Sequence, residues 1–143
     1  MIREIVKTCG LGVQVAQLPR QVYSNHLRFA RCKAIGQDGP VVLEQVIAQV
    51  TVGQEKGYEE AFAGVAGLIT SSPGCLGLRF YRCVETPGRY VVLIEWERLE
   101  DHLEGFRKSP AFEQYRGVVN DFMSVPPTVE HFELVMEHGR ADA

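Results

Sequence analysis

The segment from residue 90 to residue 119 constrains the fold of this chain more than any other. It begins with the apolar run YVVLIEW, ends that run with Trp96 between Glu95 and Glu97, and passes into helical periodicity without a long loop. A strand that leads directly into a helix places its last side chains beside the helices that cover the sheet. We therefore expect a small domain of mixed α and β structure, in which this junction contributes an aromatic ring to a pocket wall.

Strand and helix periodicities alternate on both sides of this junction. Residues 43–52 alternate between apolar and mixed positions, as a strand does, whereas residues 56–70 repeat apolar side chains every three or four positions, as a helix does. The glycines inside this helix, Gly64 and Gly67, indicate close packing against a sheet. The whole pattern predicts this order: strand 43–52, helix 56–70, strands 75–85 and 90–98 joined by the turn 86–89, helical residues 99–107, a helix that starts at Ser109-Pro110, and strand 128–136.

The order β-α-β-β-α-α-β is that of a ferredoxin-like α+β fold, with one antiparallel sheet and helices on a single face. The other face of such a sheet is uncovered within one chain. In this sequence that face includes Ile47 and Tyr81 among polar residues. A second copy of the chain would bury this mixed surface, and homodimers are the commonest oligomers. We therefore predict a homodimer.

Charge and cysteine content restrict the class of protein. The first 40 residues carry six basic and two acidic side chains, a net charge of +4, whereas the whole chain has a net charge of −3. An acidic main body argues against a nucleic-acid partner, and no apolar run is long enough for a membrane span. None of the four cysteines forms a CxxC pair, so we expect reduced thiols in a cytoplasmic protein.

We divide the chain into a basic N-terminal extension (residues 1–40), a folded domain (residues 41–137) and a C-terminal tail (residues 138–143). The extension is rich in arginine and poor in acids, which fits a flexible tail, a translated upstream segment outside the fold, or an organelle-targeting peptide. We favour the tail. No continuous apolar core follows the first basic residues, so we expect no secretory signal.

Residues 41–135 resemble the antibiotic biosynthesis monooxygenase domain, a family of dimeric α+β barrels. The resemblance rests on LEQVIAQVTV followed by GYEEAF, on PGCLGLRFYRCVETPGRYVVLIEWERLEDH, on GFRKSPAFEQYR and on the closing VEHFELV. Its most specific positions are Gly74, the Pro87-Gly88 turn, Trp96, the step from Ser109 to Phe112, and His131. The resemblance implies that this chain has the same fold and the same mode of dimerisation.

The resemblance also implies a range of activities. Some members of the family are cofactor-free monooxygenases that oxidise aromatic polyketides or quinols with O₂, relatives degrade haem, and others have no known activity. The haem-degrading branch uses an asparagine on the first strand, where this chain has Gln49, and a histidine on the last helix, where it has Tyr115 and Arg116. We therefore expect no bound haem. The sequence also lacks GxGxxG and phosphate-loop motifs, so we expect no cofactor.

Trp96 and His131 are the candidates for catalysis. Trp96 could stack against an aromatic substrate, or it could be a core residue whose indole N–H has a partner. His131 could be the general base that removes a phenolic proton, or it could be a structural histidine in a dimer interface. His102, taken with Glu95 or Asp101, has no metal-ligand spacing, so we expect no metal site.

Five further residues are candidates for binding the substrate: Arg79, Tyr81, Gln49, Phe106 and Arg107. Arg79 and Tyr81 share one face of strand 75–85, and they could orient a phenolate through charge and a hydrogen bond. Equally, both could be dimer contacts. Gln49 occupies the first-strand position that the resemblance marks. Phe106 and Arg107 lie between two helical segments, where they could form a pocket rim or be a packed ring beneath a solvated arginine.

The opposite face of strand 75–85 is predicted to carry Leu76, Leu78, Phe80 and Val84. These side chains would pack beneath the helices, because alternate residues of a strand share a face.

Three functions agree with these patterns. The leading hypothesis is a cofactor-independent oxygenase that acts on a small electron-rich phenol or quinol in a water-poor pocket. The alternative is a small-molecule-binding or stress-associated barrel without catalysis, and the third is an interaction module that uses the basic extension. The oxygenase predicts that Trp96, His131, Arg79 and Tyr81 converge on one cavity.

Overall fold

The computed structural model describes residues 39–139, so the predictions for the rest of the N-terminal extension and the C-terminal tail concern residues outside it. Within this range the predicted order of strands and helices is confirmed. The elements are β1 (Val42–Gln49), α1 (Glu55–Thr70), β2 (Cys75–Arg82), β3 (Arg89–Trp96), the π-helical turn η1 (Asp101–Gly105), the 3₁₀ turn η2 (Phe106–Lys108), α2 (Pro110–Val119), the 3₁₀ turn η3 (Asn120–Phe122) and β4 (Thr128–Glu133). Each strand ends two or three residues before the predicted end, because the apolar alternation continues past the last paired residue.

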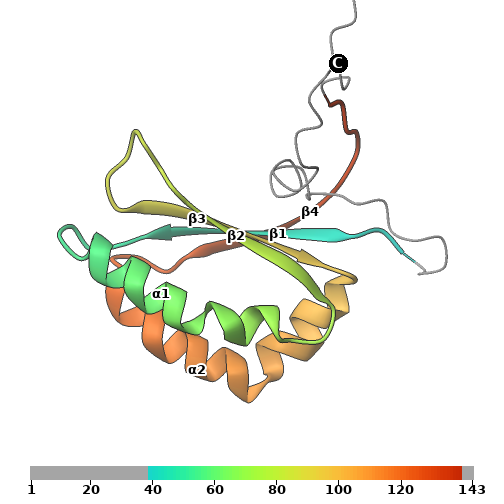
Figure 1. The fold of residues 1–143 in the computed structure, drawn as a ribbon, viewed down its shortest axis with the longest axis horizontal. Coiled ribbons are helices and arrows are strands. Elements are labelled where there is room, and N and C mark those ends of the chain that lie inside the picture. The colour runs from blue at the N-terminus through green and yellow to red at the C-terminus, as the bar shows by residue number, and fades with distance from the viewer. Residues whose placement is uncertain (1–38, 140–143) are drawn as a thin grey trace, which may run out of the picture. The chain divides into compact units, whose positions relative to one another are not determined.

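The strands of this range form one antiparallel sheet in the order β2-β3-β1-β4. β1 lies between β3 and β4, so that Glu44 of β1 is paired with Ile94 on one side and with His131 on the other. Figure 1 shows both α1 and α2 on the same side of this sheet. The ferredoxin-like arrangement, one sheet with helices on one face, is therefore confirmed.

The register of β2 differs from the predicted pattern near its start. A β-bulge between Cys75 and Gly77 inserts one extra residue opposite β3. Leu76 is 48% exposed as a result, although alternation predicted it beneath the helices, and Val84 lies beyond the strand and is also exposed. Leu78 and Phe80 do pack against the core as predicted.

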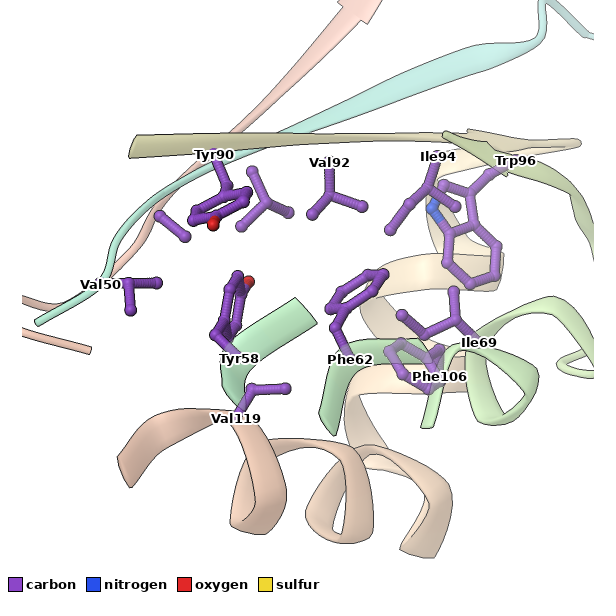
Figure 2. Close-up of a cluster of buried hydrophobic side chains, with 12 residues drawn as sticks. Val50, Tyr58, Phe62, Ile69, Tyr90, Val92, Ile94, Trp96, Phe106 and Val119 are labelled. Atoms are coloured by element: carbon purple, nitrogen blue, oxygen red, sulfur yellow. The ribbon is translucent and has the colours of Figure 1, made fainter. Parts of the chain in front are cut away.

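The core lies between the covered face of the sheet and α1, and it is strongly aromatic. In Figure 2 the side chain of Tyr90 on β3 extends toward Tyr58 of α1, and Trp96, farther along the same strand, lies beside Ile69 and Phe106. The ring of Phe62 stacks on that of Phe80 with 4.3 Å between centroids, and the rings of Tyr58 and Tyr90 meet edge to face at 5.0 Å. These contacts fix the helix layer against the sheet, and they leave one end of β1 and β3 to be covered by η1 and η2.

The helix termini follow the sequence closely. Ser109 is the N-cap of α2, since its hydroxyl accepts a hydrogen bond from the Phe112 amide at 3.2 Å, and Pro110 occupies the first turn.

The prediction for the glycines of α1 is wrong. Gly64 and Gly67 are exposed, and a Cβ atom on either would have no neighbour within 4 Å, so neither glycine permits a close contact with the sheet.

The β2–β3 hairpin turns at Gly88, whose φ of +75° favours glycine. The turn is closed by the Arg89 amide, which donates to the Thr86 carbonyl at 3.2 Å. A Cβ atom at Gly88 would lie 2.8 Å from the Val50 carbonyl oxygen, so the hairpin also needs a residue without a side chain there.

In residues 39–139 no helix has both the length and the apolar character required to cross a membrane.

Candidate functional site

A cavity of about 280 Å³ lies between the covered face of the sheet and the helices. Its wall is largely apolar and aromatic, with residues from both layers, and its polar members are few. The aromatic lining residues are Tyr58, Phe106, Phe112 and Tyr115, and the charged or titratable ones are Glu44, His102, Arg107 and Arg116. Apolar walls with a few converging polar groups are typical of small-molecule sites.

A larger hollow of about 480 Å³ is lined by residues such as Pro73, Arg98 and Asp101. Two of its charged groups pair with each other, since Arg98 donates to Asp101 at 3.1 Å, and a third, Glu104, pairs with Lys108 outside the hollow. None of the buried titratable groups opens into it. The smaller cavity is therefore the better candidate site.

Glu44 is the central polar group of the candidate site. It stands on β1 between Val42 and Val46, on the strand face that turns toward the helices, and it is 4% exposed. Its Oε2 atom accepts a hydrogen bond from the indole Nε1–H of Trp96 at 2.8 Å, and its Oε1 atom lies 3.3 Å from Nε2 of His102. A buried carboxylate needs such partners, because burial without them is strongly unfavourable.

Two histidines continue this chain of contacts away from Glu44. His102 belongs to the π-helical turn η1, is 2% exposed, and stacks on the Trp96 ring with 5.4 Å between centroids. Its Nδ1 atom lies 2.7 Å from Nε2 of His131. His131 is on β4, directly opposite Glu44 in the β1–β4 register, and is partly exposed. π-helical turns are frequent at functional sites, and here the turn points an imidazole at the sheet.

Burial suppresses charge throughout this cluster. It raises the pKa of Glu44 to about 7, against the opposing effects of the Trp96 hydrogen bond and the Arg107 charge. It also lowers the pKa of His102 to about 4, helped by His131 and Arg107, and it lowers the pKa of His131, again helped by Arg107. Between about pH 4 and pH 7 the 3.3 Å contact between Glu44 and His102 therefore joins two neutral groups and is not an ion pair.

The tyrosines of the cavity remain protonated at neutral pH. Burial raises the pKa of Tyr115 to about 12, and the negative charge of Glu44 adds to this effect. Burial raises the pKa of Tyr58 as well. A Tyr115 hydroxyl that keeps its proton can donate a hydrogen bond to an anionic ligand, so this helix residue can contribute polarity to an otherwise apolar wall.

The predicted catalytic residues both belong to this cluster, although neither lines the cavity. Trp96 is fully buried, so no face of its ring is available to a substrate, and its indole N–H has a partner in Glu44. His131 reaches the cavity wall through His102. Any effect of Trp96 or His131 on a bound molecule must therefore pass through a neighbouring side chain.

The predicted substrate-binding residues divide between the two faces of the sheet. Phe106 and Arg107 line the cavity as expected. Arg79 and Tyr81 alternate with the inward-facing Phe80, so they lie on the uncovered face. Gln49 is on that face too, and its amide donates to the Pro87 carbonyl at 3.1 Å. The expected convergence of Arg79 and Tyr81 with Trp96 and His131 does not occur within the chain, and the roles of these outer residues stay predictions.

Sequence reasoning missed Glu44 and considered His102 only as a metal ligand. The signal for Glu44 was its position, since it occupies an inward-facing site of β1 two residues before Val46. No comparable signal marked the contact of His102 with His131, because 29 residues separate them. Among the described residues there is no group of three or more histidine, cysteine, aspartate or glutamate side chains that could hold a metal ion.

The fold and the cavity define a class of protein: a one-sheet α+β domain with a largely apolar cavity between its sheet and its helices. The sequence profile of one such family, antibiotic biosynthesis monooxygenase, matches residues 40–118. This chain belongs to that family. The uncharacterised protein YczJ of Bacillus subtilis (strain 168) is 36% identical over 95 residues, which are 66% of this chain and 100% of YczJ.

Two further proteins resemble the chain at lower identity. A heme oxygenase (mycobilin-producing) of Mycobacterium tuberculosis is 29% identical over 100 residues, which are 70% of this chain and 93% of that protein. The crystal structure of a Bordetella bronchiseptica protein assigned to the antibiotic biosynthesis monooxygenases superposes with a TM-score of 0.66 and 30% identity, covering 68% of this chain and 100% of the other. Each of these three relatives is matched over at least 93% of its own length.

Proposed function

We propose that this chain is a cofactor-independent monooxygenase that oxidises a small phenol- or quinol-type compound with O₂. The observation that carries the proposal is the buried carboxylate of Glu44 in the wall of a small, largely aromatic cavity. The volume of about 280 Å³ lies near the lower end of the ~300–1,000 Å³ typical of ligand pockets, which suits one or two aromatic rings. Membership of the monooxygenase family supports the same reaction class.

Glu44 is the group best placed to take the phenolic proton. A general base works best when its pKa lies near the working pH, and burial brings the pKa of Glu44 to about 7. Arg107 lines the same cavity, where its fixed positive charge would stabilise the phenolate that forms. Trp96 then acts as a positioning residue, since its indole holds one carboxylate oxygen in place.

The phenolate supplies every electron that the reaction needs. It passes one electron to O₂, and the substrate radical and superoxide combine to form a carbon–oxygen bond. The resulting peroxide takes up a proton, the ring carbon loses its hydrogen, and the O–O bond breaks to release water. For a hydroquinone, one O₂ yields one hydroxyquinone and one water, with a four-electron oxidation of the ring. The apolar cavity favours this path, because it keeps bulk water from the radical pair.

The test is oxygen consumption by purified protein with a panel of hydroquinones and anthrone-type phenols. We expect turnover that exceeds the buffer blank and falls at least tenfold in Glu44→Gln. Glu113→Gln is the matched control, since Glu113 is exposed on α2, does not line the cavity and should keep full activity. Rates equal to the blank across the panel, unchanged by Glu44→Gln, would refute the proposal. Haem belongs in the panel because of the mycobacterial relative, and we expect no turnover of haem.

A non-catalytic binding protein is the second candidate. It is favoured by the position of Arg79 and Tyr81, which lie outside the cavity and cannot hold a phenolate there. This function predicts that panel compounds raise the melting temperature of the protein while oxygen consumption stays at the blank. The two candidates therefore differ in one measurement made on the same samples.

We also propose that the functional unit is a homodimer formed through the uncovered face of the sheet. Half-buried or exposed apolar side chains from all four strands share this face, among them Ile47 of β1, Leu93 of β3, Tyr81 of β2 and Phe132 of β4. A contiguous apolar surface of this kind favours association with a second copy. Light scattering should give twice the chain mass, and Ile47→Lys should reduce it to a single chain.

A further inference from the structure

We propose that Glu44, His102 and His131 form a proton relay, in which each proton that Glu44 gains or loses inverts the tautomers of both imidazoles. The relay connects the cavity to the outside of the domain. It rests on the proposed function for its task, which is to remove the substrate proton that Glu44 has taken. Its structural basis is independent of that task, because it follows from two close contacts in series, one of 3.3 Å between Glu44 and His102 and one hydrogen bond of 2.7 Å between His102 and His131.

The relay begins with the two contacts that link three side chains from three different elements. Glu44 Oε1 lies 3.3 Å from His102 Nε2, and His102 Nδ1 lies 2.7 Å from His131 Nε2. Both nitrogens of His102 are therefore engaged, each with one partner. Each contact has room for a single proton between its two atoms, so the position of one proton dictates the position of the next.

When Glu44 is ionised, only one arrangement satisfies both contacts. The carboxylate can only accept, so His102 carries its proton on Nε2 and leaves Nδ1 as an acceptor. His131 must then donate from Nε2, and its Nδ1 atom is unprotonated. Trp96 donates to the other carboxylate oxygen, so every donor in the cluster points toward Glu44.

When Glu44 is neutral, the whole chain is reversed. The carboxyl O–H donates to His102 Nε2, which obliges His102 to carry its proton on Nδ1 and to donate to His131 Nε2. His131 then carries its proton on Nδ1. A proton that arrives at His131 Nδ1 thus protonates Glu44 through two tautomer changes, and the reverse sequence releases the proton at His131. Neither ring becomes an imidazolium in the start or end state.

Exposure gives the relay its direction. Glu44 and His102 line the cavity and are almost completely buried, whereas His131 is partly exposed. A proton that leaves the substrate can enter at Glu44, and it can reach water at His131. The rings can remain neutral during this passage because burial disfavours their charged forms.

The other groups that face Glu44 do not interrupt the sequence. Arg107 of η2 is the cation that acts on Glu44, His102 and His131, and it lies outside the two contacts of the relay. Tyr115 of α2 feels the charge of Glu44 but holds its proton far above neutral pH. Cys75 of β2 is also within the field of Glu44, and burial raises the pKa of its thiol.

The test uses the full chain with ¹⁵N-labelled histidine and long-range ¹H–¹⁵N correlation spectra, which distinguish protonated from unprotonated ring nitrogens. His102→Gln and His131→Gln assign the two signals. Between pH 9 and pH 6 we expect both rings to change from the Nε2–H to the Nδ1–H tautomer with one shared midpoint. In Glu44→Gln both rings should stay Nδ1–H at every pH, since the amide donates to His102 Nε2. Glu95→Gln should match the wild type.

The relay is overturned if either ring keeps one tautomer across this pH range in the wild-type protein, or if the two rings change at separate midpoints. It is equally overturned if Glu44→Gln retains the shared transition. The wild-type titration alone is sufficient to refute the relay, so the test remains valid even if a variant fails to fold. Oxygen consumption is a separate readout. If the tautomers are coupled but no substrate is turned over, the proposed function is refuted and the relay stands. If substrate is turned over but the tautomers are not coupled, the relay is refuted and the proposed function stands.

Discussion

The substitution Glu44→Gln tests the electrostatics of the site through stability alone, without any substrate. The pKa of Glu44 rises from 4.5 to about 7 on folding, so the folded state binds more protons than the unfolded state between these values. The contribution of Glu44 to stability is therefore fully present below pH 4.5 and is lost as the pH rises to 7. At about 1.4 kcal/mol for each pKa unit, the loss is about 3 kcal/mol.

His102 has the opposite effect over nearly the same range. Its pKa falls from 6.5 to about 4 on folding, so its contribution to stability is present above pH 6.5 and is lost as the pH falls to 4. Between pH 4.5 and pH 6.5 the two groups largely cancel, and the wild-type protein should show little net slope from this pair. The difference between Glu44→Gln and wild type is free of the histidine contribution, so it isolates Glu44.

The assay is urea unfolding at fixed protein concentration, followed by circular dichroism at half-unit steps from pH 4.5 to pH 8. We expect the unfolding free energy of Glu44→Gln, relative to wild type, to increase by about 3 kcal/mol across this range. Glu95→Gln should change the wild-type curve less, because Glu95 is only partly buried, although burial raises its pKa as well. A difference between Glu44→Gln and wild type that stays constant with pH would mean that Glu44 is ionised at pH 4.5, and the argument from burial would be refuted.

Four further substitutions test the site and the helices around it. Trp96→Phe removes the indole donor that favours the ionised form of Glu44, so it should raise the pKa of Glu44 in a carboxyl ¹³C titration and destabilise the protein by about 1–3 kcal/mol in urea unfolding. Gly74→Ala should be strongly destabilising in the same assay, because φ at Gly74 is +81° and the new Cβ atom would lie 2.3 Å from a carboxylate oxygen of η1. Gly64→Ala should instead stabilise the protein by about 0.5–1 kcal/mol, because Gly64 lies in open space on α1. Ser109→Ala removes the N-cap of α2 and should lower the unfolding free energy by about 1 kcal/mol, with no change if the cap contact is absent in solution.

Local patterns were sufficient to predict the order and type of the elements. The alternation in β1 and the three- and four-residue spacing in α1 report which side of each element is apolar, and the Ser109-Pro110 step marks where α2 begins. The same patterns could not reveal the bulge at Cys75, because an extra residue in a strand depends on the partner strand. They also misled on Gly64, since a glycine in a helix signals close packing only when a neighbour is present.

The amino-acid sequence by itself determined the fold, because the periodicity of apolar residues is a local property that decides which faces must leave water. It also determined that a tryptophan would end β3 near the helices. Only the tertiary structure decided that Glu44, His102 and His131 would meet. These side chains come from β1, η1 and β4, and they become a connected chain of titratable groups when sheet pairing and helix packing remove them from water. Their protonation states follow from that burial, which no short stretch of sequence contains.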